Sequence, residues 1–426
     1  MTTNAPATNW AGNLTFTGRH WHRPTSVDGL RRLVAGAQRI HAVGAGHSFS
    51  AVADGPGDLV SLSDLPPLLA LDPAAGTVTV SGGVRYGELA PFLHRRGYAL
   101  ANLASLPHLT VAGAVATGTH GSGRTNPGLG SAVTAVDLVT ATGDLVHLER
   151  AHPDFPGAVV SLGALGIVAA LTLAVEPDYE VAQWVYDDLP AASLTGSVEE
   201  FVGVLGAGYS VSVFTDWAGP DFRNLWLKRR ASGRGFAEPP PERWLGAVLA
   251  DSPRHPVFGM SPEACTEQGG VPGPWYQRLP HFRLEFTPSA GKELQTEYLM
   301  PLEHGPAALR ALAGIAPELA PLTQTCEVRT VAADALWLST AYQRDSMAVH
   351  FTWQPDQPAV LDLLVEVERA LAPYTPRPHW AKLFRAGAAD LAPLYPRWAD
   401  FASLRRRYDP TGKFGNPFTD ALFPTA

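Results

Sequence analysis

Cysteine is nearly absent from this 426-residue chain, which contains only Cys265 and Cys326. Two cysteines would permit one disulfide, but so few thiols are more typical of a reduced, intracellular protein. The first fourteen residues contain neither a basic region nor an apolar run, so no signal peptide is expected. We therefore predict a cytoplasmic protein.

Basic clusters are also missing. The longest is Arg405-Arg406-Arg407, and the formal net charge is −8, which argues against nucleic acid as a partner. Hydrophobic residues make up 46% of the chain and charged residues 17%, so a large folded core is expected. The length predicts two or three domains, and we expect a monomer.

Long apolar runs are limited to residues 158–175, which contain no charge. This run is near the length of a membrane span, but Gly163 and Gly166 interrupt it and its end alternates as a strand does. Pro156 and Pro177 bound the run. A buried helix, a turn and a strand therefore explain it better, and no membrane association is expected.

A glycine-containing loop, Val43–Ser48, follows a short strand expected at residues 39–43. Gly44 and Gly46 allow backbone conformations that turn successive amides toward an anion such as a pyrophosphate. The G-x-G-x-x-G pattern of nicotinamide-binding domains is incomplete, because Phe49 stands where its third glycine would be. A tight turn that carries His47 on the surface is the alternative.

A second stretch, residues 110–123, is small, rich in hydroxyl groups and almost uncharged. Gly113 would let the backbone approach a flat ligand closely, Thr117 and Thr119 offer hydroxyls, and the backbone amides can contact phosphate oxygens. The alternative is a close-packed helix followed by a flexible loop.

Beyond Pro177 the composition changes to a second α+β domain with a sizeable antiparallel sheet. Strands are expected at residues 283–287, 296–300, 325–330 and 347–353, and helices at residues 307–312 and 360–371.

Two of these strands carry paired polar residues. Glu327 and Arg329 share one strand face, and His350 and Thr352 share another, because side chains alternate along a strand. Together these four side chains could bind a polyhydroxylated substrate, and His350 could take a hydroxyl proton. The alternative is a cross-strand salt bridge on a solvated face, together with one histidine whose hydrogen bonds are satisfied within the fold.

Lysine is rare, and Lys382 lies in an apolar neighbourhood where it needs a partner, either a carboxylate or an electron-rich ring edge. No group of histidine, cysteine and carboxylate residues has the spacing of metal ligands, so no metal is expected.

Three separated motifs together resemble the vanillyl-alcohol-oxidase/PCMH-type flavoproteins, most closely the branch of alditol (xylitol) oxidases and aldonolactone oxidases. They are the Gly44–Ser48 loop, the stretch from Ser105 to Gly123, and His379-Trp380-Ala381-Lys382 with Asp409-Pro410-x-Gly412-Lys413-Phe414. The Glu327-x-Arg329 pair and the Asn9–Asn13 segment favour alditol oxidases. Many relatives have glycine where Ala381 stands.

The resemblance implies a PCMH-type FAD-binding domain at residues 1–180, a substrate-binding cap domain at residues 181–373, and a C-terminal segment, residues 374–426, that returns to the first domain. His47 would be bonded covalently to FAD. The other implied cofactor-binding residues are Val43, Gly44, Ala45, Gly46, Ser48, Ser105, Thr110, Gly113, Thr117, Gly118, Thr119, His120, Val168 and His379.

The implied activity is oxidation of the terminal primary hydroxyl of a polyol, such as xylitol or sorbitol, to the aldose, with reduction of O2 to H2O2. His350, Arg329, Lys382 and Glu327 would be catalytic, and Ser105 and Thr352 would join them in binding substrate. An aldono-1,4-lactone oxidase or dehydrogenase is the alternative within this fold, and small Ala104 leaves the choice between oxidase and dehydrogenase open. A flavin-carrying binding or storage protein is the alternative outside catalysis.

Overall fold

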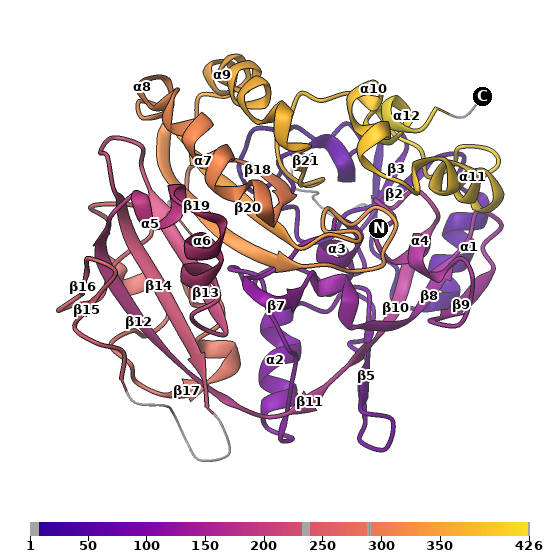
Figure 1. The fold of residues 1–426 in the computed structure, drawn as a ribbon. Helices are drawn as coiled ribbons and strands as arrows, with labels where there is room; N and C mark the ends of the chain where they lie inside the picture. The colour runs from indigo at the N-terminus through magenta and orange to yellow at the C-terminus, as the bar shows by residue number, and fades with distance from the viewer. Residues whose placement is uncertain (1–7, 232–238, 288, 290, 425–426) are drawn as a thin grey trace.

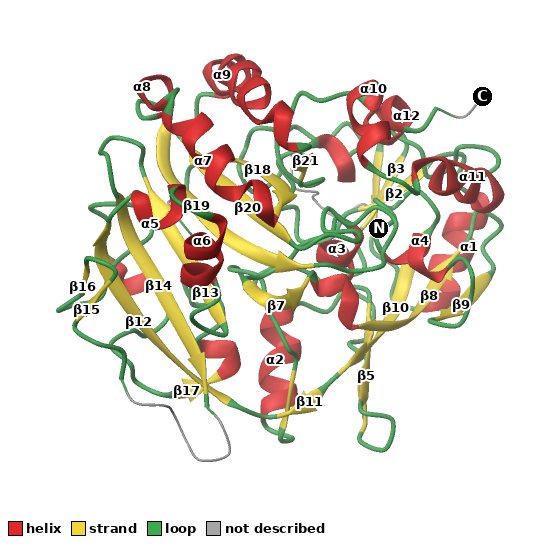
Figure 2. Ribbon diagram, in the orientation of Figure 1, coloured by secondary structure: helices red, strands yellow, loops and turns green. Residues whose placement is uncertain are grey.

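The computed structural model describes residues 8–231, 239–287, 289 and 291–424. Among these residues, no helix combines the length and the apolar character that crossing a membrane requires. The architecture is α+β, as predicted, with strands and helices distributed over the whole described chain (Figures 1 and 2).

The first third of the chain forms a small parallel sheet and a larger antiparallel one. The parallel sheet has the order β1 (His20–His22), β3 (Asp58–Val60), β2 (Ile40–Ala42), and the antiparallel sheet has the order β4 (Leu69–Asp72), β5 (Thr77–Ser81), β10 (Ile167–Ala174), β8 (Val133–Val139), β9 (Leu145–Glu149). Helices α1 (Val27–Gly36), α2 (Tyr86–His94), α3 (Val111–Ala116) and α4 (Phe155–Val159) accompany them, and β6 (Tyr98–Ala99) pairs with β11 (Glu176–Pro177).

The uncharged run at residues 158–175 is divided as expected. Its start lies at the end of α4, a turn follows, and the rest forms β10 in the middle of the antiparallel sheet. Gly163 and Gly166 both have positive φ, at 73° and 154°, which is why the turn requires glycine there.

The middle of the chain builds one large sheet, which extends from the left side of Figure 2 to its centre. Its main path is β15 (Arg243–Trp244), β16 (Ala247–Leu249), β12 (Glu180–Leu189), β14 (Phe222–Arg230), β13 (Ser210–Thr215), β19 (Thr323–Ala332), β20 (Ser346–Trp353), β18 (Leu294–Pro301), β21 (Arg377–Pro378). Off this path, β17 (Gly273–Pro274) pairs with β12, and β7 (Gly123–Pro127) pairs in parallel with β19. The large antiparallel sheet predicted for this part of the chain is therefore present.

Helices cover one face of the large sheet. A buried apolar cluster joins Phe201 and Leu309 to Val213, Val328 and Phe351, and so fixes which side chains of β13, β19 and β20 point toward the helices. The helices concerned are α5 (Ala192–Thr195), α6 (Val198–Leu205), α7 (Gly305–Ala313), α8 (Ala316–Leu319) and α9 (Gln357–Leu371). Because strand side chains alternate, Glu327 and Arg329 point to the opposite face.

The strand predicted at residues 283–287 is wrong. Only Phe282, just before it, makes an isolated bridge with Cys265, and the chain then turns, with the Phe286 amide donating to the carbonyl of Arg283. The Arg283 side chain donates to the Cys265 carbonyl instead of following a neighbouring strand. Residues 283–287 alternate between apolar and polar side chains, but no neighbouring strand is available for them to pair with.

The end of the chain packs on its beginning. In Figure 1 the yellow helices lie near β2 and β3, and Phe401 and Leu404 share a buried core with Val111. The Asn416 side chain donates to the carbonyls of Val52 and Asp54. These helices are α10 (Ala388–Leu391), α11 (Trp398–Tyr408) and α12 (Pro417–Leu422). This packing is what the expected return of residues 374–426 requires, and the domain boundaries themselves stay predictions.

Candidate active site

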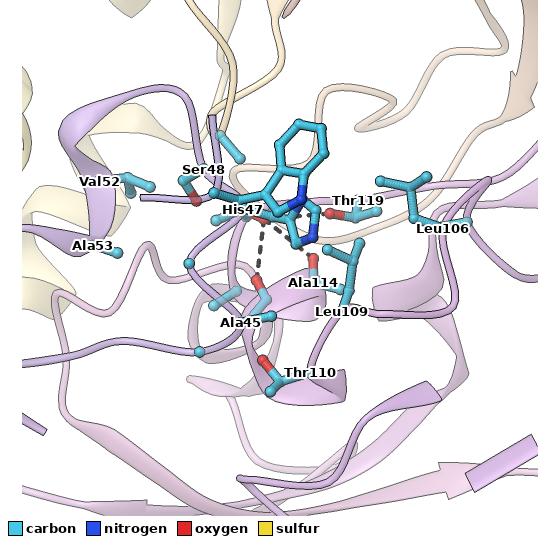
Figure 3. Close-up of a pocket in the computed structure, with 18 of the residues that line it drawn as sticks. Ala45, His47, Ser48, Val52, Ala53, Leu106, Leu109, Thr110, Ala114 and Thr119 are labelled. Atoms are coloured by element: carbon cyan, nitrogen blue, oxygen red, sulfur yellow. Dashed lines mark hydrogen bonds between the residues drawn. The ribbon is translucent and has the colours of Figure 1, made fainter. Parts of the chain in front are cut away.

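A cavity of about 520 Å³ lies between the first part of the chain and the face of the large sheet that the helices do not cover. This face is called the open face of the sheet below. The His47 loop, residues 104–120, the strands β18, β19 and β20, and the 379–382 segment all contribute to its wall. Figure 3 shows His47, Thr110 and Thr119 drawn together around this pocket. Three motifs that are far apart in sequence therefore line one space.

The His47 loop is held from two sides. The Trp10 amide donates to the Gly46 carbonyl at 2.8 Å, and the Trp10 ring stacks on the His47 ring with centroids 4.7 Å apart. The Phe49 amide donates to the Ala381 carbonyl at 2.7 Å, which ties the loop to the C-terminal motif. The alternative interpretation, a tight turn that carries His47 on the surface, therefore does not describe this loop.

His47 is an uncharged imidazole at neutral pH. Burial, with smaller contributions from the nearby His108 and Arg85, lowers its pKa to about 4. A neutral ring has one nitrogen with a free lone pair, which is the form that can act as a nucleophile.

The glycine positions of the two predicted cofactor stretches face each other across Thr110. A Cβ on Gly44 would lie 2.4 Å from Thr110 Oγ1, and one on Gly113 would lie 2.7 Å from the same atom. Thr110 Oγ1 is itself buried and has no hydrogen-bond partner among the described residues. A buried hydroxyl that lacks a partner, in a place where only glycine backbone fits, suits the phosphates of a dinucleotide such as FAD.

A row of charged side chains crosses three neighbouring strands on the open face of the sheet. Glu297 of β18 lies opposite His350 of β20, and His350 lies opposite Glu327 of β19. Glu297 and Glu327 are both almost fully buried. The predicted pairing of Glu327 and Arg329 with His350 and Thr352 on one cavity wall is present, and the solvated-face alternative is wrong because this face is buried.

Glu297 joins the two cations of the site. Arg329 Nη2 donates to one of its oxygens at 2.7 Å, and Lys382 Nζ donates to the other at 2.6 Å. Burial alone would raise the pKa of Glu297, but the charges of Lys382 and Arg329 hold it well below its usual range. The partner that Lys382 needed is therefore a carboxylate, and Glu297 stays ionised.

Glu327 lies on the same face, two strands away from Glu297. His281 Nε2 lies 3.0 Å from one of its oxygens, while His350 Nδ1 and Arg329 Nη1 lie 3.5 Å and 3.6 Å from the other. Burial raises the pKa of Glu327, but Arg329 and His281 outweigh it and hold the pKa well below the usual range. Arg329 Nη1 also donates to Ser105 Oγ at 3.2 Å, so the arginine connects the large sheet to the stretch at residues 104–120.

Every predicted site residue but one lines the cavity. The exception is Gly118, whose φ is +70° and whose missing side chain would point toward Val160 and Trp380 in the core. The residues that line it, as predicted, are Val43, Gly44, Ala45, Gly46, His47, Ser48, Ser105, Thr110, Gly113, Thr117, Thr119, His120, Val168, Glu327, Arg329, His350, Thr352, His379 and Lys382.

Sequence reasoning missed Glu297 and His281. Glu297 falls inside a strand that was expected at residues 296–300, and a lone carboxylate in that apolar strand was a usable signal. His281 lies in an irregular segment, where no periodicity indicates which way a side chain points. Within the described residues, His120, Glu297 and His379 also hold possible metal-ligand atoms within 4.8 Å of one another. Both oxygens of Glu297 already bond cations, which is unfavourable for a divalent ion.

The His47 loop and the charged row both lie in regions of the chain that match models of known protein families. A family model described as an FAD binding domain matches residues 20–149, and one described as D-arabinono-1,4-lactone oxidase matches residues 289–422. The chain is 52% identical to alditol oxidase from a Streptomyces species over 414 residues, which cover 96% of this chain and 97% of that protein. It is 30% identical to L-gulono-1,4-lactone dehydrogenase from Mycobacterium tuberculosis, over 96% of this chain and 97% of that protein.

A solved structure shows the same fold. Cholesterol oxidase from B. sterolicum superposes with a TM-score of 0.79 at 15% identity, covering 98% of this chain and 96% of that one. The first family match carries the His47 loop and the second carries the charged row, so the chain is an FAD-dependent oxidoreductase of the vanillyl-alcohol-oxidase/PCMH type. Within that class it belongs to the family of alditol oxidase, because the 52% identity extends over nearly its whole length.

Proposed function

We propose that the protein is an alditol oxidase that converts the terminal primary hydroxyl of a polyol, of the xylitol or sorbitol type, to the aldose. The observation that carries the proposal is the one cavity that joins the His47 loop to Glu327, Arg329 and His350. The strong similarity to a curated alditol oxidase supports it. The His47 loop and the stretch at residues 104–120 would hold FAD, whose chemistry would be two-electron acceptance from the substrate and reduction of dioxygen to hydrogen peroxide, with both hydrogens coming from the substrate CH–OH group.

The chain's own residues would orient the polyol and take its proton. His350 is uncharged at neutral pH, because burial, with Lys382 adding to it, lowers its pKa to about 4. Its Nε2 is buried without a hydrogen-bond partner among the described residues, so that nitrogen is free to accept the hydroxyl proton. Arg329 would stabilise the oxygen as it becomes negative, and Glu327, Thr352 and Ser105 would bind the hydroxyls along the chain.

The experiment is an anaerobic titration followed by an assay for hydrogen peroxide. We expect xylitol or sorbitol to bleach the yellow flavin absorbance without oxygen and to yield hydrogen peroxide in air. Bleaching by a 1,4-lactone but not by polyols would instead favour the lactone enzyme. No bleaching by either class would favour a flavin-carrying binding or storage protein.

An aldono-1,4-lactone oxidase or dehydrogenase is the second candidate. The match of residues 289–422 to the D-arabinono-1,4-lactone oxidase model favours it, because that segment carries Glu297, Glu327, Arg329 and His350. The lactone relative is more distant, at 30% identity against 52% for alditol oxidase. The same titration separates the two.

We propose further that His47 is bonded covalently to FAD. A His47→Ala variant should then release its flavin when the protein is precipitated with acid, whereas the unaltered protein should keep the yellow colour in the pellet. His108→Ala is the matched control, because His108 lies beside His47, with ring centroids 6.5 Å apart, and should not carry the bond. Yellow pellets from His47→Ala would overturn the assignment.

We also infer a monomer in the cytoplasm. Cys265 and Cys326 are both buried free thiols, which fits a reducing compartment.

A further inference from the structure

Two buried groups near Glu327 have no part in the chemistry described so far: Lys228, and His281, which also lines the cavity. Lys228 is on β14 and is 1% exposed, and His281 is 4% exposed. A lysine inside a protein is costly unless its charge has partners, so its position needs a reason.

The partners of Lys228 match an ammonium group. Its Nζ lies 2.6 Å from the Leu279 carbonyl, 3.3 Å from the Pro280 carbonyl and 3.3 Å from His281 Nδ1. An ammonium has three hydrogens and no acceptor, so each hydrogen has one acceptor here. Burial lowers the pKa of Lys228 to about 7, and the charge of Glu327 opposes this shift. The ionised Glu327 needs a donor, so the hydrogen of the neutral His281 ring is on Nε2, and His281 Nδ1 accepts from Lys228.

With its hydrogen on Nε2, His281 can donate to Glu327. Its Nε2 donates to Glu327 Oε1 at 3.0 Å. The rings of Phe214 and Trp226 meet the imidazole edge to face, at 5.7 Å and 5.2 Å between centroids, and hold it in this orientation. Burial and the charge of Lys228 together lower the pKa of His281 to about 4, although Glu327 opposes the shift, so the ring is neutral and these neighbours decide the position of its hydrogen.

The second oxygen of Glu327 lies beside His350 and Arg329. Since Oε1 is occupied by His281, the ionised Oε2 is left for His350 Nδ1 at 3.5 Å and for Arg329 Nη1 at 3.6 Å. A carboxylate oxygen opposite Nδ1 favours the tautomer with the hydrogen on Nδ1. The lone pair of His350 is then on Nε2, the nitrogen without a partner.

We propose that Lys228 and His281 are positioning residues: Lys228 fixes the tautomer of His281, and His281 fixes Glu327 so that His350 keeps its Nε2 lone pair toward the substrate. This inference deepens the proposed function and rests on it only for the substrate. The arrangement of hydrogens along Lys228, His281, Glu327 and His350 is a property of the protein itself.

The test compares two substitutions of His281 in the FAD-loaded protein. In His281→Gln the amide nitrogen can still donate to Glu327, whereas in His281→Phe the ring fills the space and donates nothing. We expect His281→Phe to lower the limiting rate of anaerobic flavin reduction by xylitol about 10–100-fold with little change in the xylitol dissociation constant, and His281→Gln to recover most of that rate. Equal rates for the two variants would overturn the proposal.

Lys228→Met tests the first step. If Lys228 acts through His281, its loss should slow flavin reduction in the unaltered background and have no further effect in the His281→Phe background. Additive losses would mean that Lys228 acts independently, which contradicts the proposal. Should Lys228→Met fail to fold, the His281 pair decides the question alone.

A measurement without substrate separates this inference from the proposed function. In protein labelled with ¹⁵N-histidine, the His350 resonances, assigned with His350→Gln, should show a protonated Nδ1 and an unprotonated Nε2. His281→Phe should shift them toward a mixture of tautomers. A proton on His350 Nε2 in the unaltered protein overturns the inference, even if xylitol reduces the flavin, and failure of xylitol to do so overturns only the proposed function.

Discussion

Replacing Glu297 with leucine is expected to lower the free energy of unfolding by about 3–5 kcal/mol, because it leaves two buried cations without their shared carboxylate. Arg329 and Lys382 bond its two oxygens at 2.7 Å and 2.6 Å, and Glu297 is 1% exposed. Urea unfolding of flavin-loaded protein measures the loss. The rate of flavin reduction should fall as well, because both cations line the cavity.

Glu297→Gln is the matched control. Its amide keeps the size of the side chain and one acceptor oxygen, so the loss should be smaller than in Glu297→Leu. Adding Lys382→Met to Glu297→Leu removes one of the two unpaired cations and should recover part of the lost stability. If Glu297→Leu unfolds at the same urea concentration as the unaltered protein, the ion network is not a source of stability.

The difference in stability between the unaltered protein and Glu297→Leu should depend on pH with a definite sign. The folded-state pKa of Glu297 is held well below its ordinary value, despite burial, by Lys382 and Arg329. A carboxyl group with a lowered folded pKa stabilises the protein above its unfolded pKa, and this contribution is lost as the pH falls through the folded value. The stability gap between the unaltered protein and Glu297→Leu should therefore be constant near neutral pH and close only in strong acid.

Local periodicity explains what the sequence could predict of this site. Alternation along a strand is a local rule, so the shared face of Glu327 and Arg329 could be read directly, as could that of His350 and Thr352. The glycine loop was also visible, because glycine marks turns wherever it occurs, whereas the C-terminal motif was found only through the resemblance to known flavoproteins.

The rest of the site depends on contacts between distant parts of the chain. Glu297 meets Lys382 only because β18 pairs with β20 on one side and β21 on the other, and no local rule gives that order. His281 reaches Glu327 from a segment without regular structure. The strand wrongly predicted at residues 283–287 has the same origin, since alternation makes a strand only where a neighbouring strand is available.

His350→Gln is expected to slow flavin reduction by a polyol about 10²–10⁴-fold, the usual contribution of a general base. The lysine and arginine of the site cannot replace it, because Lys382 and Arg329 both donate to Glu297 and are positively charged. Glutamine keeps a side chain of similar length that can bind a hydroxyl but cannot accept its proton as a base. Stopped-flow reduction with xylitol, without oxygen, measures the loss directly.

The pH profile and a neighbouring variant distinguish base catalysis from binding. Because burial, reinforced by Lys382, lowers the pKa of His350 to about 4, the base form persists at neutral pH, and the rate in the unaltered protein should fall only as the pH drops toward 4. In His350→Gln this fall should disappear. Thr352→Val, two residues along the same strand face, should weaken xylitol binding while leaving the limiting rate within about tenfold, since it removes one hydrogen bond to substrate and no base. A His350→Gln enzyme that keeps the unaltered limiting rate and profile would remove His350 from the chemistry and leave it, like Thr352, as a binding residue.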